Sequence, residues 1–198
     1  MAKLIQFSSE HARRRDLKRA GKQEILERSG QLNLFDARKQ KAGDVQPILH
    51  FSNIFVKALY LDEMGHPQAE EAYLEAIEKQ VRTADAWCNL AIIYASRAED
   101  LKAIDALTTA LTLAPRHALC HYNLANIYLD HGNLNLARLH YEIAREIDPE
   151  FPEVFFNLGL VYLIRGHRSK AVDMLQRYEE LMPGGLDELS EYLKDMEG

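Results

Sequence analysis

The sequence has few of the residues that build disulfide, metal and catalytic sites. It has only two cysteines, Cys88 and Cys120, which form neither a CxxC pair nor a disulfide framework, so a reducing compartment fits. It contains no glycine-rich phosphate loop, and no serine or cysteine nucleophile stands in a recognisable pattern with a histidine and an acid. These absences argue against an enzyme, and we expect no cofactor.

Long apolar runs are also missing. No stretch approaches the ~20 apolar residues that a membrane-spanning helix needs. The apolar run at the N-terminus is short for a signal peptide, and Arg13, Arg14 and Arg15 follow it instead of preceding it. We therefore expect a cytoplasmic protein with no membrane partner.

Charge is unevenly distributed along the 198 residues, whose formal net charge is -6. Residues 1–47 hold 11 Lys/Arg and 6 Asp/Glu, whereas residues 48–198 hold 13 and 24. The two parts carry opposite net charge, so they should attract each other or seek different partners. Because Gly30, Gly43 and Pro47 interrupt the first part, we predict a basic, largely flexible N-terminal arm over residues 1–47.

Three stretches of the chain repeat one pattern at an interval of 34 residues. An aromatic or histidine, a leucine, a small residue and a tyrosine are followed by an alanine and a proline. The matched sets are Trp87, His121 and Phe155; Leu90, Leu124 and Leu158; Ala91, Ala125 and Gly159; Tyr94, Tyr128 and Tyr162; Ala103, Ala137 and Ala171; and Pro115, Pro149 and Pro183. This pattern resembles the tetratricopeptide repeat (TPR), over about residues 48–198.

The resemblance implies an all-α fold, a right-handed α-solenoid of about four helix-turn-helix repeats with a C-terminal capping helix. The expected repeats are at about 50–83, 84–117, 118–151 and 152–185, with the cap at 186–198 and helices near 84–97, 100–113, 118–131, 134–147, 152–165 and 168–181. The first repeat is degenerate. Lys57 stands at its small position, and Gly65 is one position late compared with Gly132 and Gly166.

The resemblance also implies a concave groove, lined by the first helix of each repeat, in which members of the family bind peptide segments of other proteins. The residues it places there are Asp85, Cys88, Asn89, Ile92, Leu119, Tyr122, Asn123, Asn126, Leu129, Phe156, Asn157 and Leu160. We therefore interpret the chain as an interaction scaffold or adaptor that binds a peptide or amphipathic helix of another protein.

Asparagine keeps the 34-residue step in this set, at Asn89, Asn123 and Asn157. An amide side chain both donates and accepts hydrogen bonds, so such a ladder could bracket the peptide groups of a ligand. Alternatively, these side chains satisfy local backbone groups.

A second hypothesis comes from the arm. Gln31, Leu32, Leu34 and Phe35 resemble the Gln-Leu-x-Leu-Phe motif by which bacterial proteins bind the replicative sliding clamp. With the basic cluster around Arg13–Arg15, which could contact nucleic acid weakly and non-specifically, this motif indicates a DNA-replication or repair accessory protein. Alternatively, the motif is an apolar anchor that folds back onto the groove.

His117, Cys120 and His121 stand close enough in sequence to suggest a metal site. However, His121 occupies the aromatic core position of its repeat. We therefore predict a packed histidine and assign no metal.

Overall fold

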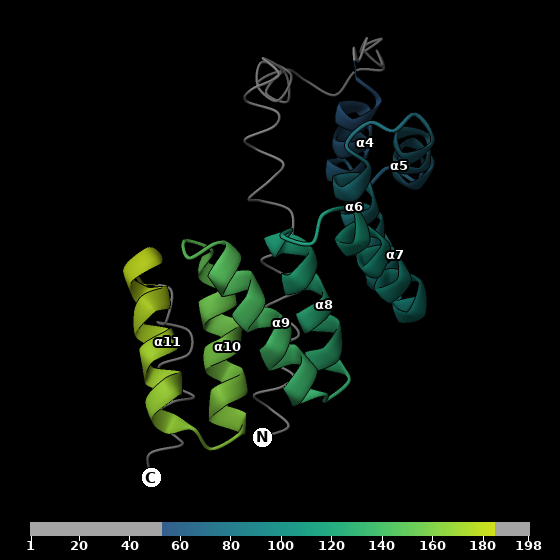
Figure 1. The fold of residues 1–198 in the computed structure, drawn as a ribbon. Coiled ribbons are helices and arrows are strands. Elements are labelled where there is room, and N and C mark those ends of the chain that lie inside the picture. The colour runs from purple at the N-terminus through teal and green to yellow at the C-terminus, as the bar shows by residue number, and fades with distance from the viewer. Residues whose placement is uncertain (1–52, 185–198) are drawn as a thin grey trace. The chain divides into compact units, whose positions relative to one another are not determined.

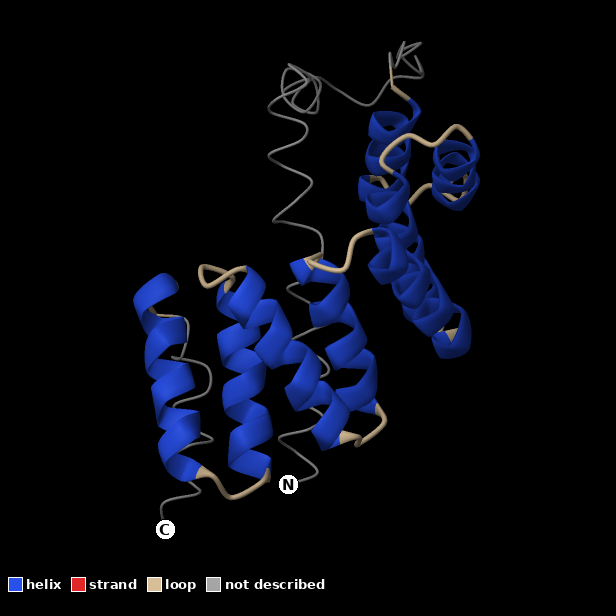
Figure 2. Ribbon diagram, viewed as in Figure 1, coloured by secondary structure: helices blue, strands red, loops and turns tan. Residues whose placement is uncertain are grey.

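A computed structural model describes residues 53–184, and this part of the chain is all-α (Figures 1 and 2). Its helices are α4 (Ile54–Glu63), α5 (Ala69–Glu78), α6 (Thr83–Ser96), α7 (Asp100–Leu113), α8 (Ala118–Asp130), α9 (Leu134–Ile147), α10 (Pro152–Ile164) and α11 (Arg168–Leu181). The helix pairs expected for the last three repeats are confirmed, with bounds that differ by at most one residue. None of these helices is long and apolar enough to cross a membrane.

The described residues divide into two units between Leu113 and Ala114. The N-terminal unit holds the pairs α4–α5 and α6–α7, and the C-terminal unit holds α8–α9 and α10–α11 (Figure 1). In each unit the second helix of one pair packs on the first helix of the next, α5 on α6 and α9 on α10. The predicted arm and the predicted cap lie outside the described residues.

Proline ends the second helix in three of the four pairs. The helices α7, α9 and α11 stop two residues before Pro115, Pro149 and Pro183, as the sequence predicts, because the residue preceding proline avoids the α region. Helix α5 has no such proline and ends through a left-handed cap instead. Gln80 has φ 55°, and the Val81 N–H donates to the carbonyl of Ala76 over 2.8 Å.

The turn inside each pair has the same hydrogen bonds in all four repeats and shows how the first repeat aligns. The His66 N–H donates to Leu61 O over 2.8 Å, as the Glu99 N–H does to Tyr94 O over 2.9 Å. Leu61 therefore corresponds to Tyr94, and the small position of α4 falls one residue later than a 34-residue step places it.

That small position is filled by Ala58, which is 0% exposed. The expectation that Lys57 replaces the small residue is therefore wrong. Its cause is a spacing that is one residue shorter between the left-handed residue of the turn and the buried alanine of the second helix: Gly65 precedes Ala69 by four residues, whereas Ala98 precedes Ala103 by five.

The small position sets how closely paired helices approach. A Cβ on Gly159 of α10 would lie 2.9 Å from both Cγ and Cδ2 of Leu175 on α11. Ala91 and Ala125 hold the same place in their repeats and are 1% and 0% exposed. A larger side chain here would force the paired helices apart.

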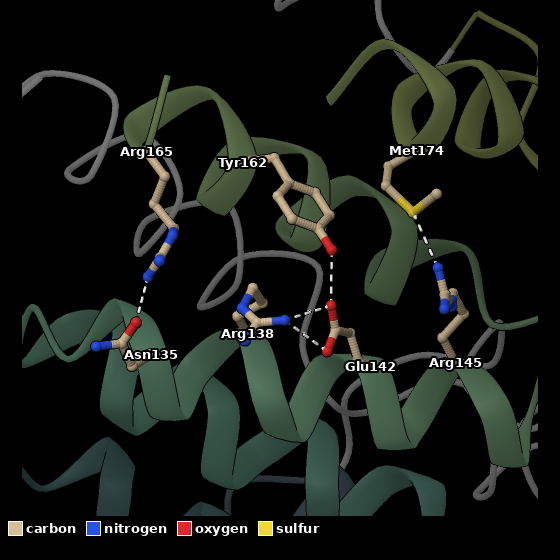
Figure 3. Close-up of polar contacts among 7 residues, drawn as sticks. All are labelled: Asn135, Arg138, Glu142, Arg145, Tyr162, Arg165 and Met174. Atoms are coloured by element: carbon tan, nitrogen blue, oxygen red, sulfur yellow. Dashed lines mark hydrogen bonds and ion pairs between the residues drawn. The ribbon is translucent and has the colours of Figure 1, made fainter. Parts of the chain in front are cut away.

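Charged side chains join the third and fourth repeats along α9 and α10 (Figure 3). Tyr162 donates its hydroxyl to Glu142 Oε1 over 2.6 Å, and Arg138 donates to both carboxylate oxygens at 2.7 and 2.8 Å. Burial alone would raise the pKa of Glu142, but the hydrogen bonds from Tyr162 and Arg138 outweigh it and hold that pKa below its usual value. Figure 3 also shows Arg165 with Asn135 and Arg145 with Met174.

Candidate functional site

The predicted groove residues all lie on the first helices of their repeats, on α6 in the N-terminal unit and on α8 and α10 in the C-terminal unit. We call this surface of each unit its first-helix face. Three of the residues are half-buried: Asp85, Ile92 and Leu119. The others are buried: Cys88, Asn89, Tyr122, Asn123, Asn126, Leu129, Phe156, Asn157 and Leu160. The half-buried residues are therefore the members of the set that a partner reaches most readily.

The two aromatic members pack inside their own repeats. The Phe156 ring lies 5.0 Å from that of Tyr178 on α11, and the Tyr122 ring lies 5.8 Å from that of Tyr141 on α9, measured between centroids. Tyr122 also contacts Phe151, the residue that precedes α10, at 4.9 Å. These rings hold each first helix against its neighbours, so their removal would disturb the fold as well as any binding surface.

A buried polar network crosses from the third repeat to the fourth. Asn157 on α10 donates its amide to Asn126 Oδ1 over 3.0 Å and to the Tyr122 hydroxyl over 3.2 Å, both on α8. Tyr141 on α9 donates its hydroxyl to the same oxygen of Asn126. Asn157 is 1% exposed and Tyr141 is 0% exposed. The network therefore joins three helices in a place that water barely reaches.

The asparagines of the 34-residue step have different environments. Asn157 uses its amide N–H groups inside the network, on the side chains of Tyr122 and Asn126 and not on the local backbone groups that the alternative interpretation of the ladder names. Asn89, in the N-terminal unit, is 7% exposed, and its side chain makes no hydrogen bond with the described part of the chain. Asn123 is 5% exposed. A shared repeat position thus does not give a shared role.

Sequence reasoning included Asn126 but missed Tyr141, its partner. The signal that could have found it is the residue type at this repeat position, compared between repeats. Tyr141 stands where the second repeat has Leu107 and the fourth has Leu175, so a hydroxyl replaces an apolar group of these neighbouring repeats, as Tyr73 does in the first repeat. A buried tyrosine hydroxyl usually has a hydrogen-bond partner, which here is the Asn126 amide.

His121 is packed in the third repeat, as predicted, and is 8% exposed. Its Nδ1 lies 3.0 Å from Nδ1 of His140 on α9, and its Nε2 lies 3.1 Å from the carbonyl oxygen of Pro115. Burial lowers the pKa of His140 to about 4, helped by His121, and burial also lowers the pKa of His121. His117 caps α8, where its Nδ1 accepts the N–H of Cys120 over 3.3 Å. Side-chain packing and helix capping thus account for the positions of these histidines.

The clamp-binding motif, Gln31, Leu32, Leu34 and Phe35, lies outside the described residues. The role of this segment stays a prediction from the sequence. The same holds for nucleic-acid contact by the basic arm.

Comparison with known proteins places repeats of one kind in both units. A family model described as tetratricopeptide repeat matches residues 58–118, and a second, described as TPR repeat, matches residues 125–164. The chain is 36% identical over 110 residues to BBSome complex member BBS4 of Bos taurus. The aligned region covers 56% of this chain and 21% of that protein. It is also 34% identical over 104 residues to protein O-mannosyl-transferase TMTC3 of Homo sapiens. Here the aligned region covers 50% of this chain and 11% of that protein.

Solved structures share the fold at low sequence identity. The superposition on the crystal structure of MamA covers 70% of this chain and 80% of the MamA chain, with a TM-score of 0.57 and 19% identity. The structure of TTC0263, a thermophilic TPR protein of Thermus thermophilus, covers 65% and 73%, with a TM-score of 0.56 and 20% identity. The chain spans about a fifth or less of the length of the two curated relatives. The family matches and the repeated helix pairs together show that the chain is a tetratricopeptide-repeat protein.

Proposed function

We propose that this protein is an adaptor that binds a peptide or helix of another protein on its first-helix face. Tetratricopeptide repeats generally act as scaffolds for protein–protein interaction. We infer a binding role without catalysis, because repeats of this family typically form non-catalytic interaction scaffolds. Cys88 and Cys120 are both free thiols, which supports a reducing compartment such as the cytoplasm.

The observation that carries the proposal is a difference in charge between two interfaces of the third and fourth repeats. One interface lies between α9 and α10, and the other lies between α8 and α10. Between α9 and α10 the contacts involve the charged pair Arg138 and Glu142. Between α8 and α10 two hydrogen bonds join uncharged groups, the amides of Asn126 and Asn157 and the hydroxyl of Tyr122. Uncharged amide and hydroxyl groups suit a neutral or apolar peptide, whose own backbone needs hydrogen-bond partners.

Leu119 supplies an accessible apolar contact on the same unit. It lies in the first turn of α8, one helical turn before Tyr122 and Asn123, and is half-buried. Residues three and four apart on a helix share a face. We therefore propose Leu119 as the apolar contact that a ligand meets first.

The test is a selection of random linear peptides on the full chain, followed by affinity measurements with two variants. Leu119→Arg places a charge on the first-helix face, whereas Leu139→Arg changes a 45% exposed leucine on α9 of the same unit. We expect Leu119→Arg to weaken the selected peptides at least about tenfold, or about 1.4 kcal/mol, and Leu139→Arg to leave their affinity unchanged. Equal effects of the two variants, or no selected peptide at all, would rule out this site.

A further inference from the structure

Helix α5 has an exposed side that faces away from the core of the N-terminal unit. Its buried side packs against residues of α4 and α6 and holds Ala69, Ala72, Tyr73 and Ala76. The opposite side holds Glu71, Leu74, Glu75 and Glu78, which follow the helical spacing of three and four residues. We call these four residues the outer face of α5. Leu74, in the middle of this acidic face, is 43% exposed.

The concentration of acidic residues on this side is highest in the first repeat. The positions that correspond to the outer face of α5, aligned through the buried alanine near the start of each second helix, are Asp105, Thr108, Thr109 and Thr112 in α7; Leu139, Glu142, Ile143 and Glu146 in α9; and Asp173, Gln176, Arg177 and Glu180 in α11. The whole N-terminal unit follows the same trend. Residues 53–113 hold ten acidic and five basic residues, whereas residues 114–184 hold nine and seven.

Two carboxylates of the outer face lack an ionic partner within residues 53–184. Glu75 pairs with Lys79 one helical turn later. Glu71 and Glu78 make no ion pair with any residue in this range. Like charges three or four residues apart on a helix repel each other, so Glu75 faces repulsion from both neighbours. A basic segment that settles on this face would relieve the repulsion.

The N-terminal part of the chain contains a segment with the matching composition. Residues 13–22 include one acidic residue, Leu17 and the six basic residues Arg13, Arg14, Arg15, Lys18, Arg19 and Lys22. Basic residues thus surround one leucine here, as acidic residues surround Leu74 on α5. Thirty residues separate Lys22 from Asn53, which precedes α4. A connection of this length reaches at most about 100 Å, whereas a helix the size of α5 is about 15 Å long, so the segment can reach α5.

We propose that residues 13–22 dock on the outer face of α5, with basic side chains on its three glutamates and Leu17 against Leu74. Single exposed ion pairs are weak and are screened by salt. The contact therefore depends on several pairs acting together and on the covalent connection, which raises the local concentration of the segment. It lies on a second helix and does not depend on the proposed adaptor function. While docked, the basic segment is neutralised and is withheld from nucleic acid.

The experiment is carbodiimide cross-linking of the full chain, which joins a lysine amine to a carboxylate in contact with it, followed by mass spectrometry. At low ionic strength we expect links from Lys18 and Lys22 to the outer face of α5. These links should be severalfold more abundant than links to Glu146, an exposed carboxylate of α9. The pair of Lys79 and Glu75 is the internal control for the reaction. The links from Lys18 and Lys22 should fall severalfold at about 1 M salt, where the Debye length is about 3 Å.

Two results of this cross-linking would overturn the docking. One is the absence of links from Lys18 and Lys22 to α5 while the control pair reacts, and the other is equal linking to α5 and to Glu146. A mixture of isotope-labelled and unlabelled chains shows whether the links lie within one chain. Links that join labelled to unlabelled chains at random would assign the outer face to a second copy and would contradict the intramolecular contact.

A charge exchange tests the pairing itself. Lys18→Glu and Lys22→Glu are combined with Glu71→Lys and Glu78→Lys, which leaves the net charge unchanged. Links between the same positions should return in the exchanged chain, and far-UV circular dichroism shows whether it folds. A folded exchanged chain without these links would contradict direct pairing. If that chain does not fold, the cross-links of the wild-type chain decide.

Discussion

Asn157 on α10 donates its side-chain amide to the side-chain oxygen of Asn126 on α8 across 3.0 Å. The two residues belong to consecutive repeats, and the bond lies among buried groups. Asn89, at the same repeat position as Asn157, makes no such bond within residues 53–184. One repeat position therefore serves different purposes in the two units, and this difference can be measured.

Replacing Asn157 by alanine should destabilise the chain, because it removes two buried hydrogen bonds, one to the Tyr122 hydroxyl and one to Asn126 Oδ1. We expect a loss of about 1–3 kcal/mol in the free energy of unfolding, measured by urea with far-UV circular dichroism. Asn89→Ala is the matched control and should cost less than about 1 kcal/mol. Equal losses in the two variants would show that the network contributes nothing specific.

Replacing Ala98 by glycine should stabilise the N-terminal unit. Ala98 has φ 58° in the turn where the third and fourth repeats have Gly132 and Gly166, with φ 71° and 77°. A left-handed conformation costs a residue with a Cβ about 1–2 kcal/mol, and the greater freedom of glycine in the unfolded chain offsets part of that gain. The expected net gain is about 0.5–1 kcal/mol, seen as a higher thermal midpoint.

The control for that variant is Ala95→Gly, inside α6, which should lower stability by about 1 kcal/mol. A fall in stability for both variants would contradict the left-handed conformation at Ala98.

The histidine pair should make stability depend on pH. The pKa of His140 is lowered to about 4 and that of His121 is also lowered, so the unfolded chain, with histidine pKa near ~6.5, binds protons more readily than the folded chain. Stability from the neutral pair is therefore present above pH ~6.5 and is lost as the pH falls towards 4. Unfolding free energies measured from neutral pH down to this range should show the loss.

Replacing His140 by leucine should reduce that pH dependence, because it removes the more strongly shifted group. His66→Gln, a change at an exposed position, is the control and should leave the dependence as in wild type. An unchanged pH slope in His140→Leu would mean that other groups cause the acid sensitivity.

The contact between Tyr162 and Glu142 should couple the last two repeats. Tyr162→Phe removes, and Glu142→Gln weakens, a hydrogen bond of 2.6 Å between α10 and α9. In a double-mutant cycle we expect a coupling energy of about 0.5–1.5 kcal/mol, since one partner is ionised and both are partly buried. Losses that simply add would indicate that the two side chains do not interact in solution.

The repeat positions predicted the fold because they encode steric requirements that recur. Proline after three of the four second helices and a small residue at each crossing, such as Gly159 against Leu175, are visible in the sequence. The first repeat was harder to align. A one-residue change in its turn moves the small position from Lys57 to Ala58, and a fixed step cannot reveal such a shift.

The candidate site was less predictable, because hydrogen-bond partners come from different helices. The 34-residue step grouped Asn157 with Asn89, yet the partners of Asn157 are Tyr122 and Asn126 on the preceding first helix. Whether a side chain is reachable also depends on packing. Tyr122 satisfies the repeat pattern for a groove residue and is nevertheless 3% exposed.

The most direct test of the adaptor function is a cross-linking map of a bound peptide. A photoreactive benzoylphenylalanine is placed at Leu119 on α8 or at Leu139 on α9, and the full chain is irradiated with a peptide selected from the random library. Mass spectrometry then locates the cross-links. We predict cross-links from position 119, abolished by excess unlabelled peptide, and none from position 139. Competed cross-links from position 139 with none from position 119 would contradict binding on the first-helix face.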